Sequence, residues 1–359
     1  MYRELLAQRH LPELLTFADG TEVCAAAWPK RREEIRQILL HELFGTLPDV
    51  PYTLEFAVEK EENHYYMGGK ALIRIIRITV QMHGESFFWN AVLSVPKSDH
   101  PVPVFVMAAF EKFFPVDTLP AEEILDAGYG ICTFVCPKVT SDDGDFTNGL
   151  ARAFYPEGKR ELYDGGKIAV WAWAASRIVD VLVQMPEVDT KRLIVVGHSR
   201  LGKTALWAGA MDDRFAAVVA VQSGCGGAAL ARANTGEKVE DITRNFPFWF
   251  SQAYAAYAGR EDNMPFDQHF LLSLIAPRLL CVTSAAGDLW ADPLGEYLDC
   301  LAVSPVYDLL GKQGVEETEK LTDSVVLHAG NVGYNRRPGN HFFSRTDWNH
   351  ILSFLDAKL

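Results

Sequence analysis

The sequence predicts an α/β fold in three layers, with a mostly parallel central sheet between two layers of helices. Short apolar segments alternate with longer helical ones over the second half of the chain, which is typical of a parallel sheet covered on both faces. The 359 residues are 48% hydrophobic and 23% charged, which is enough for a well-buried core. Linkers and repeats are not evident, so we expect one domain over residues 1–359.

The expected elements follow in chain order. The first fifty residues, 1–50, carry two helical patches, and we expect them to wrap the core without forming a domain. The next apolar region alternates and is rich in isoleucine and valine, as antiparallel opening strands should be. The remaining segments alternate between strand and helix. The expected ranges are helices over 4–15, 29–43, 166–185 and 347–355, antiparallel strands within 69–95, and strands at 102–107, 193–196, 279–283 and 324–328, the last of the sheet.

Composition excludes several classes of function. The formal net charge is −13, which opposes general binding to nucleic acid or to an anionic membrane. The six cysteines lack zinc-site spacing, and we expect no metal or cofactor. No apolar run reaches membrane-spanning length, and no signal-peptide pattern is present at Met1. We therefore expect a cytoplasmic protein, with an extracellular or periplasmic one as the alternative if a leader has been removed, and the oligomeric state is left open.

The most informative segment is G-H-S-R-L-G-K over residues 197–203. It follows an apolar strand and precedes a helical stretch, as in the nucleophile elbow of α/β-hydrolases. Such a turn projects the hydroxyl of Ser199 above the sheet, while unpaired N–H groups at the helix start can stabilise an oxyanion. The usual second glycine is displaced from position 201 to Gly202, so a tight turn between buried elements is the alternative interpretation.

An acid and a base can be sought in the order that this fold uses, serine then acid then histidine. Asp288 follows the predicted strand at 279–283, where catalytic groups of open α/β sheets gather. Asp292, four residues later, is its rival. His341 lies on a polar, glycine-bearing loop after the last predicted strand, and a loop histidine can accept the serine proton while a buried carboxylate holds its tautomer.

The other histidines have structural interpretations. His198 precedes the serine, so its side chain should point away from the nucleophile and pack or bond under the turn. His269 lies in a predicted helix, and His328 ends a predicted strand. We therefore predict the triad Ser199, Asp288 and His341.

These residues carry a family resemblance. The chain resembles the glucuronoyl esterases, carbohydrate esterase family fifteen, and the match covers about half of its length. In that family the elbow glycine stands at the third position after serine and is followed by lysine, as here. Members are α/β-hydrolases that cleave esters of glucuronic acid side chains on xylan. The matching segments are 197–206, 223–230, 276–278, 288–296, 333–334, 339–341 and 347–348.

The resemblance implies roles for further residues. Arg200 resembles the residue whose backbone N–H and guanidinium face the oxyanion, where a fixed cation would stabilise developing charge. Lys203, one helical turn after Ser199, and Glu237 resemble the residues that bind sugar hydroxyls. Trp290 resembles the tryptophan that packs on the sugar, and simple core burial is its alternative.

Two positions depart from the family pattern. In fungal members the acid follows the strand after the elbow helix, where this chain has Gln222. An amide cannot stabilise an imidazolium as a carboxylate does, whereas some bacterial relatives carry the acid where this chain has Asp288. Relatives also carry a Gly-Asn-His loop where this chain has the segment from Phe110 to Pro115, which we expect to line the alcohol side.

The resemblance implies a serine ester hydrolase that acts on esters of glucuronic or 4-O-methylglucuronic acid, in polymers or in oligosaccharides. An acetyl xylan esterase or a broader carboxylesterase would use the same triad. A pseudo-enzyme that binds sugar without turnover is the alternative of another class, because position 222 is an amide and the Phe110 loop is changed.

Overall fold

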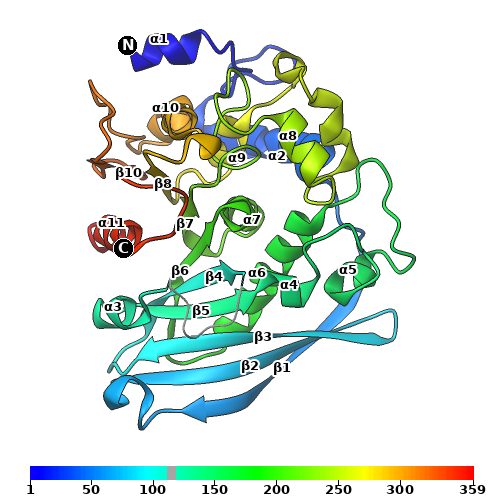
Figure 1. The fold of residues 1–359 in the computed structure, drawn as a ribbon, viewed down its shortest axis with the longest axis vertical. Coiled ribbons are helices and arrows are strands. Elements are labelled where there is room, and N and C mark those ends of the chain that lie inside the picture. The colour runs from blue at the N-terminus through cyan, green and yellow to red at the C-terminus, as the bar shows by residue number, and fades with distance from the viewer. Residues whose placement is uncertain (111–118) are drawn as a thin grey trace.

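The computed structural model describes residues 1–110 and 119–359. In that part a ten-stranded sheet runs through the molecule in the order β1-β2-β3-β5-β4-β6-β7-β8-β10-β9, with helices on both sides (Figure 1). Neighbouring strands from β5 to β10 pair parallel, and the other pairs are antiparallel. The strands are β1 Tyr52–Glu62, β2 Ala71–Met82, β3 Glu85–Pro96, β4 Val102–Ala109, β5 Gly130–Val135, β6 Val188–His198, β7 Phe215–Val221, β8 Leu279–Ala285, β9 Val325–Leu327 and β10 Val332–Arg337.

The central strands alternate between two cores. In β6, Leu193 and Val195 contribute to the core beneath α6 and α7, whereas Ile194 and Val196 face the core beneath α3 and α11. Figure 1 shows these two pairs of helices on opposite sides of the sheet. A strand buried on both faces reads as a continuous apolar run, which explains why the sequence marks it clearly. The fold is therefore the predicted three-layer αβα sandwich.

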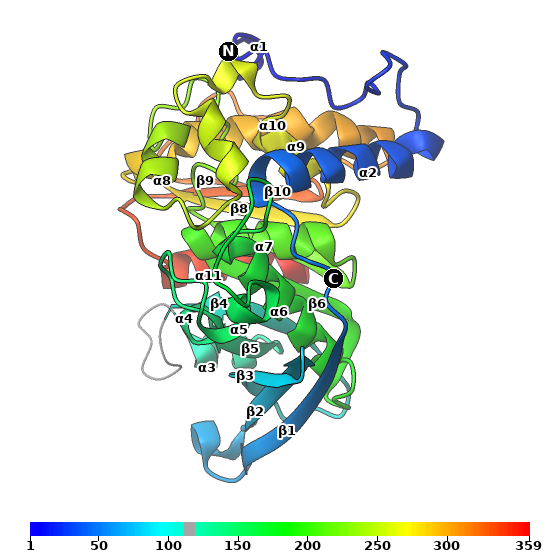
Figure 2. The ribbon, with the colours of Figure 1, turned by 90° about the vertical axis from the view of Figure 1, so that its right-hand side faces the viewer.

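The helices differ widely in length. Figure 2 shows α1 beyond α10, at the end of the molecule opposite the β1–β3 strands. The helices are α1 Tyr2–Ala7, α2 Trp28–Leu39, α3 Ala121–Asp126, α4 Cys136–Val139, α5 Gly149–Phe154, α6 Lys167–Leu182, α7 Arg200–Met211, α8 Val239–Asn245, α9 Gln268–Ser273, α10 Pro293–Leu309 and α11 Arg345–Asp356. Short 3₁₀ turns lie at 25–27, 66–69, 252–257, 261–263 and 289–291, and a π-helical turn covers 40–44.

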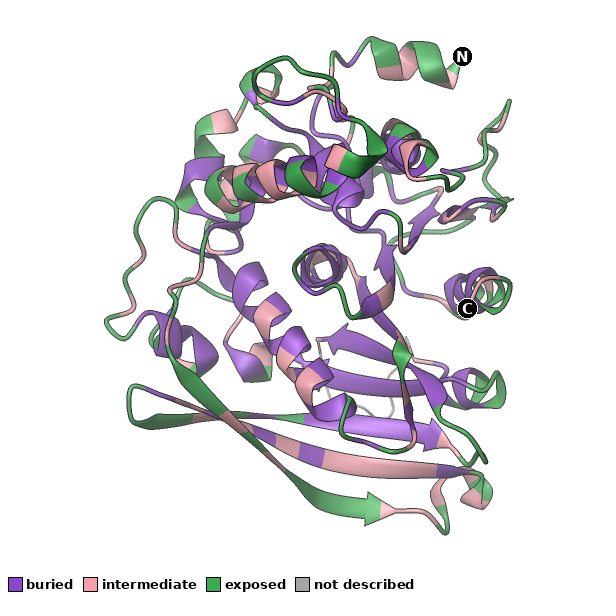
Figure 3. Ribbon diagram, turned by 180° about the vertical axis from the view of Figure 1, so that it is seen from behind, coloured by how far each residue is buried: buried purple, intermediate pink, exposed green. Residues whose placement is uncertain are grey.

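Several elements match their predictions. The antiparallel strands within 69–95 form a hairpin of β2 and β3 that turns at His83 and Gly84, both with positive φ, as a two-residue hairpin requires. The long helix expected over 166–185 is α6, and the closing helix is α11. In Figure 3 the middle of the sheet is buried, whereas β1 is mostly exposed at its edge.

Two elements differ from expectation. The predicted last strand at 324–328 is β9, but β10 follows it and inserts between β8 and β9. β10 has the sequence V-G-Y-N-R-R. It is mostly buried, but its polar second half does not have the apolar pattern of a buried strand. The helix expected over 4–15 ends at Ala7, because His10 takes a positive φ and Pro12 follows. Within the described ranges, no helix is long and apolar enough to cross a membrane.

Candidate active site

Ser199 forms the turn between β6 and α7. Its backbone has φ 59° and ψ −130°, which is strained for a residue with a side chain and is typical of a nucleophile elbow. The turn needs glycine at position 197, since a Cβ there would lie 2.0 Å from the carbonyl oxygen of Leu201. Gly202 packs against the end of β7, where a Cβ would lie 2.9 Å from Ser223 Cβ. Both glycines therefore have a packing reason.

His341 and Asp288 are joined by a short hydrogen bond. His341 Nδ1 lies 2.6 Å from Asp288 Oδ2, and the carboxylate is almost fully buried. A carboxylate is an acceptor, so Nδ1 carries the proton and Nε2 is left with its lone pair. The His341 ring lies 4.5 Å from that of His198, the residue before Ser199, so the imidazole is beside the elbow.

Backbone hydrogen bonds fix the two loops that carry this pair. Ala286 N donates to Arg337 O, and Gly287 N donates to Gly339 O, both at 2.8 Å. The loop after β8 is therefore paired with the loop after β10. Close contact is possible because residue 287 is glycine: a Cβ there would lie 2.5 Å from the side-chain oxygen of Asn340.

Asp292 occupies a different position from Asp288. It caps α10, where its Oδ1 accepts from Gly295 N at 3.1 Å and from Thr235 Oγ1 at 3.0 Å. The side chain is 1% exposed. These contacts hold the loop that leads to Glu237, whereas the hydrogen bond to His341 comes from Asp288.

The guanidinium of Arg200 lies among aromatic rings. Its Nη1 donates to Asp142 Oδ2, and its Cζ is 4.7 Å from the Trp249 ring centroid and 5.2 Å from that of Phe110. Asp142 Oδ1 also accepts from Trp249 Nε1 at 2.7 Å. The carboxylate thus fixes both the cation and the ring on which it stacks. The rest of the predicted loop at Phe110, residues 111–118, lies outside the described part.

Lys203 and Glu237 form a buried charged pair. Their Nζ and Oε2 atoms are 3.9 Å apart, and Lys203 Nζ also donates to Ser223 O at 2.5 Å. Burial lowers the pKa of Lys203 and raises the pKa of Glu237, while the opposite charge of each partner acts against these shifts. Lys203 lies one helical turn after Ser199, and its charge holds the Glu237 carboxylate beside it.

Trp290 is not a core residue. It is 56% exposed, so the burial interpretation from sequence is wrong. It lies in a single 3₁₀ turn that begins directly after Asp288. Glu237 N donates to Trp290 O at 2.8 Å, which ties the tryptophan to the Lys203–Glu237 pair. An exposed indole beside buried polar groups offers a ligand an apolar face next to hydrogen-bonding groups.

Two further residues were given no part in the site by sequence reasoning. His198 Nε2 lies 3.2 Å from Gln222 Oε1, and burial lowers the pKa of this histidine to about 4. It bonds under the turn as predicted, but it also faces His341. Asp142 lies in the acidic run at 141–145, which is a sequence signal that could have pointed to a partner for Arg200.

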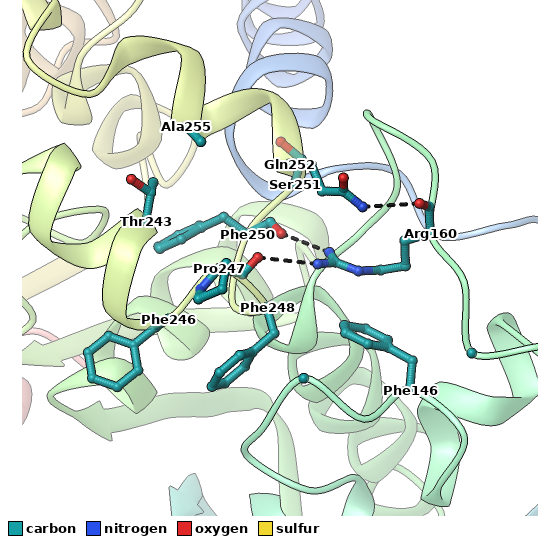
Figure 4. Close-up of a pocket in the computed structure, with 12 residues that line it drawn as sticks. Phe146, Arg160, Thr243, Phe246, Pro247, Phe248, Phe250, Ser251, Gln252 and Ala255 are labelled. Atoms are coloured by element: carbon teal, nitrogen blue, oxygen red, sulfur yellow. Dashed lines mark hydrogen bonds between the residues drawn. The ribbon is translucent and has the colours of Figure 1, made fainter.

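A cavity of about 470 Å³ is lined by residues of the 243–255 segment and by Phe146 and Arg160 (Figure 4). Phe246 both lines this cavity and stacks on Trp249, with ring centroids 3.8 Å apart. Phe146, Phe248 and Arg160 also line it, and Arg160 donates to the carbonyl of Phe250 at 2.8 Å. Phe246 therefore lies between this cavity and the guanidinium of Arg200, whose Cζ is 5.6 Å from its ring centroid.

Comparisons with known proteins give consistent matches. The family model "Glucuronyl esterase, fungi" matches residues 78–311. Carbohydrate esterase MZ0003, from an unknown prokaryotic organism, is 33% identical over 97% of this chain and 89% of its own length. The 4-O-methyl-glucuronoyl methylesterase of Podospora anserina is 29% identical over 82% of this chain, which spans 59% of that protein.

Solved structures are similar over nearly the whole chain. A glucuronoyl esterase from Solibacter usitatus has a TM-score of 0.88 and 34% identity, with 97% of each chain covered. An esterase of carbohydrate esterase family fifteen from a marine bacterial metagenome, described as promiscuous, has a TM-score of 0.88, 32% identity and the same coverage. Fold and sequence therefore give the same match.

Proposed function

The chain belongs to the glucuronoyl esterase family, and on that premise we propose that it hydrolyses esters of glucuronic or 4-O-methylglucuronic acid with Ser199 as nucleophile. The observation that carries the proposal is the hydrogen bond of 2.6 Å between His341 and Asp288, beside the strained turn at Ser199. It is an enzyme of the serine ester hydrolase class.

The proposed chemistry has two steps. Ser199 Oγ attacks the ester carbonyl while His341 Nε2 takes its proton, and the C–O bond breaks as His341 returns the proton to the leaving alcohol. Water then attacks the acyl-enzyme by the same route and releases the acid and the free serine. Asp288 stabilises the imidazolium. The N–H groups at the start of α7 and the guanidinium of Arg200 stabilise the oxyanion.

The polar pair and the exposed indole would hold the sugar. Lys203 can donate to hydroxyls and Glu237 can accept from them, while Trp290 presents an apolar face for the ring. The substrate is a small molecule or an oligosaccharide that carries a uronate ester. We keep the cytoplasmic location as a prediction, which fractionation of the source cells would test.

The experiment compares two substrates, methyl glucuronate and p-nitrophenyl acetate. Glu237→Gln and Lys203→Met should raise KM for the glucuronate, because each lost hydrogen bond to a charged group is worth about 1.5–3 kcal/mol, or roughly ten- to hundredfold in kcat/KM. The acetate lacks the sugar, so its hydrolysis should change little.

Matched controls are the exposed neighbours Lys238→Met and Glu240→Gln, which should affect neither substrate. Equal losses on both esters would assign Lys203 and Glu237 to the fold and leave a broader esterase, the second candidate, which the promiscuous marine relative favours. Absence of turnover on both esters by the folded protein would indicate the sugar-binding pseudo-enzyme.

A further inference from the structure

Gln222 stands at the carboxyl end of the strand that follows the elbow helix. It follows β7 directly, has a positive φ of 47° and is 1% exposed. Its backbone N–H donates to Thr283 O at 2.7 Å, which extends the pairing of β7 with β8. A non-glycine residue in this region of backbone space needs surrounding contacts to hold it.

The side-chain amide pairs with the loop that carries the base, His341. Oε1 accepts from Phe342 N at 2.9 Å, and Nε2 donates to Phe342 O at 3.1 Å. The amide therefore pairs with both polar groups of one residue, as a neighbouring strand would. Oε1 also lies 3.2 Å from His198 Nε2. A carboxylate could accept these bonds but could not donate to a carbonyl, so the arrangement selects an amide.

Phe342 directly follows His341, so this pairing acts on the base. The His341 side chain is 44% exposed, which means that burial does not fix it. Its loop is held on one side by the bond from Gly287 to Gly339 and on the other by Gln222. Arg337 also donates to the Phe342 carbonyl, but the Phe342 N–H is held by Gln222.

We propose that Gln222 is a positioning residue, which pairs with the Phe342 backbone and aligns His341 between Asp288 and Ser199. The inference rests on the proposed triad and adds a second support to it. The amide also accepts a hydrogen bond from His198, so it links the residue before Ser199 to the residue after His341.

The test uses Gln222→Met, which keeps the length of the side chain and removes all three bonds. We expect kcat to fall roughly ten- to hundredfold on both methyl glucuronate and p-nitrophenyl acetate, with KM changed less than threefold, because the base serves every ester. Gln222→Glu keeps an acceptor for the Phe342 N–H but sets its second oxygen against the Phe342 carbonyl, so it should lower kcat as well. Gln268→Met is the matched control, since Gln268 is a buried glutamine on α9 away from the base loop.

A spectroscopic signal separates positioning from general destabilisation. The proton between His341 Nδ1 and Asp288 should give a downfield resonance that is absent in His341→Gln. It should shift or broaden in Gln222→Met and persist in Gln268→Met. Should Gln222→Met not fold, Gln222→Glu is measured in the same way.

An unchanged kcat and an unchanged resonance in a folded Gln222 variant would overturn the inference while leaving the triad in place. Loss of the same size in Gln268→Met would overturn it too. A wild-type enzyme that hydrolyses the acetate but not the glucuronate would instead refute the proposed substrate, and the acetate would still report on Gln222.

Discussion

At the scale of single residues, the acid is distinguished from its neighbour by one contact. Asp288 holds the Nδ1 proton of His341, whereas Asp292 caps α10 and binds Thr235. Both carboxylates are buried, so burial alone would not separate them. The hydrogen-bond partner separates them, because only a carboxylate that contacts the imidazole can stabilise its charged form.

We therefore predict that Asp288→Asn lowers kcat by about 10⁴, as expected when a triad acid becomes its amide and the wrong tautomer is favoured. Asp292→Asn is the matched control, since asparagine can still cap a helix and tolerate positive φ. Steady-state kinetics on methyl glucuronate measures both. A crippled Asp292→Asn beside a mild Asp288→Asn would reassign the acid.

Only some residues of the candidate site could be predicted from the sequence. Ser199, Asp288 and His341 stand beside segments with clear strand or loop patterns, so their order along the chain could be read. The pairing of the Gln222 amide with the Phe342 backbone could not, because no motif in the sequence joins these two positions 120 residues apart. A sequence pattern reports neighbours along the chain, not pairings of that kind.

At the scale of elements, the elbow depends on glycine. The backbone of residue 197 lies against Leu201, and no movement of a side chain could relieve a Cβ placed 2.0 Å from a carbonyl oxygen. The end of β6 and the start of α7 are therefore held at a fixed spacing. That spacing aims the hydroxyl and the helix N-terminus at one point.

Gly197→Ala should consequently reduce both stability and turnover. Overpacking against backbone costs about 1–3 kcal/mol or more, because the turn must open. Chemical denaturation and kinetics on p-nitrophenyl acetate measure the two effects. Gly144→Ala should change neither, because a Cβ at position 144 meets no atom within 4 Å. A fully active, equally stable Gly197→Ala would show that the turn tolerates a side chain.

Elements were predicted where burial on two faces gives a clear signal. β4 and β8 lie in the middle of the sheet and match the predicted segments within two residues, whereas β6 contains the predicted segment 193–196 but begins at Val188. β10 was missed, since its last three residues are Asn335, Arg336 and Arg337, whose polar side chains make hydrogen bonds to neighbouring elements. The packing of residues 1–50 around the core as part of one domain stays a prediction.

At the scale of the whole molecule, a buried acid couples stability to pH. Glu296 is 0% exposed, accepts from Ser284 Oγ at 2.5 Å and from Gly224 N at 3.1 Å, and burial raises its pKa to about 8. The folded protein keeps this proton between about pH 4.5 and 8, whereas the unfolded chain releases it. Stability from this group is therefore present at low pH and is lost as the pH rises through this window.

Glu296→Gln should remove that dependence, because an amide stays neutral and can still bond Ser284 and Gly224. We expect the free energy of unfolding of the variant to rise relative to that of the wild type between pH 5 and pH 8. The measured quantity is the difference in free energy of unfolding between the variant and the wild type at each pH. His198 and His269, with pKa values lowered to about 4, destabilise both proteins as the pH falls below about 6.5, and this effect cancels in the difference. Parallel pH profiles would contradict the assignment.

The central claim is that this chain hydrolyses glucuronate esters through Ser199. The most direct measurement is the release of methanol from methyl glucuronate by the wild type and by Ser199→Ala, under conditions in which both proteins are folded. The wild type should turn the ester over, and the variant should fall by several orders of magnitude, because a nucleophile and its base act as a unit. Turnover by Ser199→Ala within tenfold of the wild type would contradict the account.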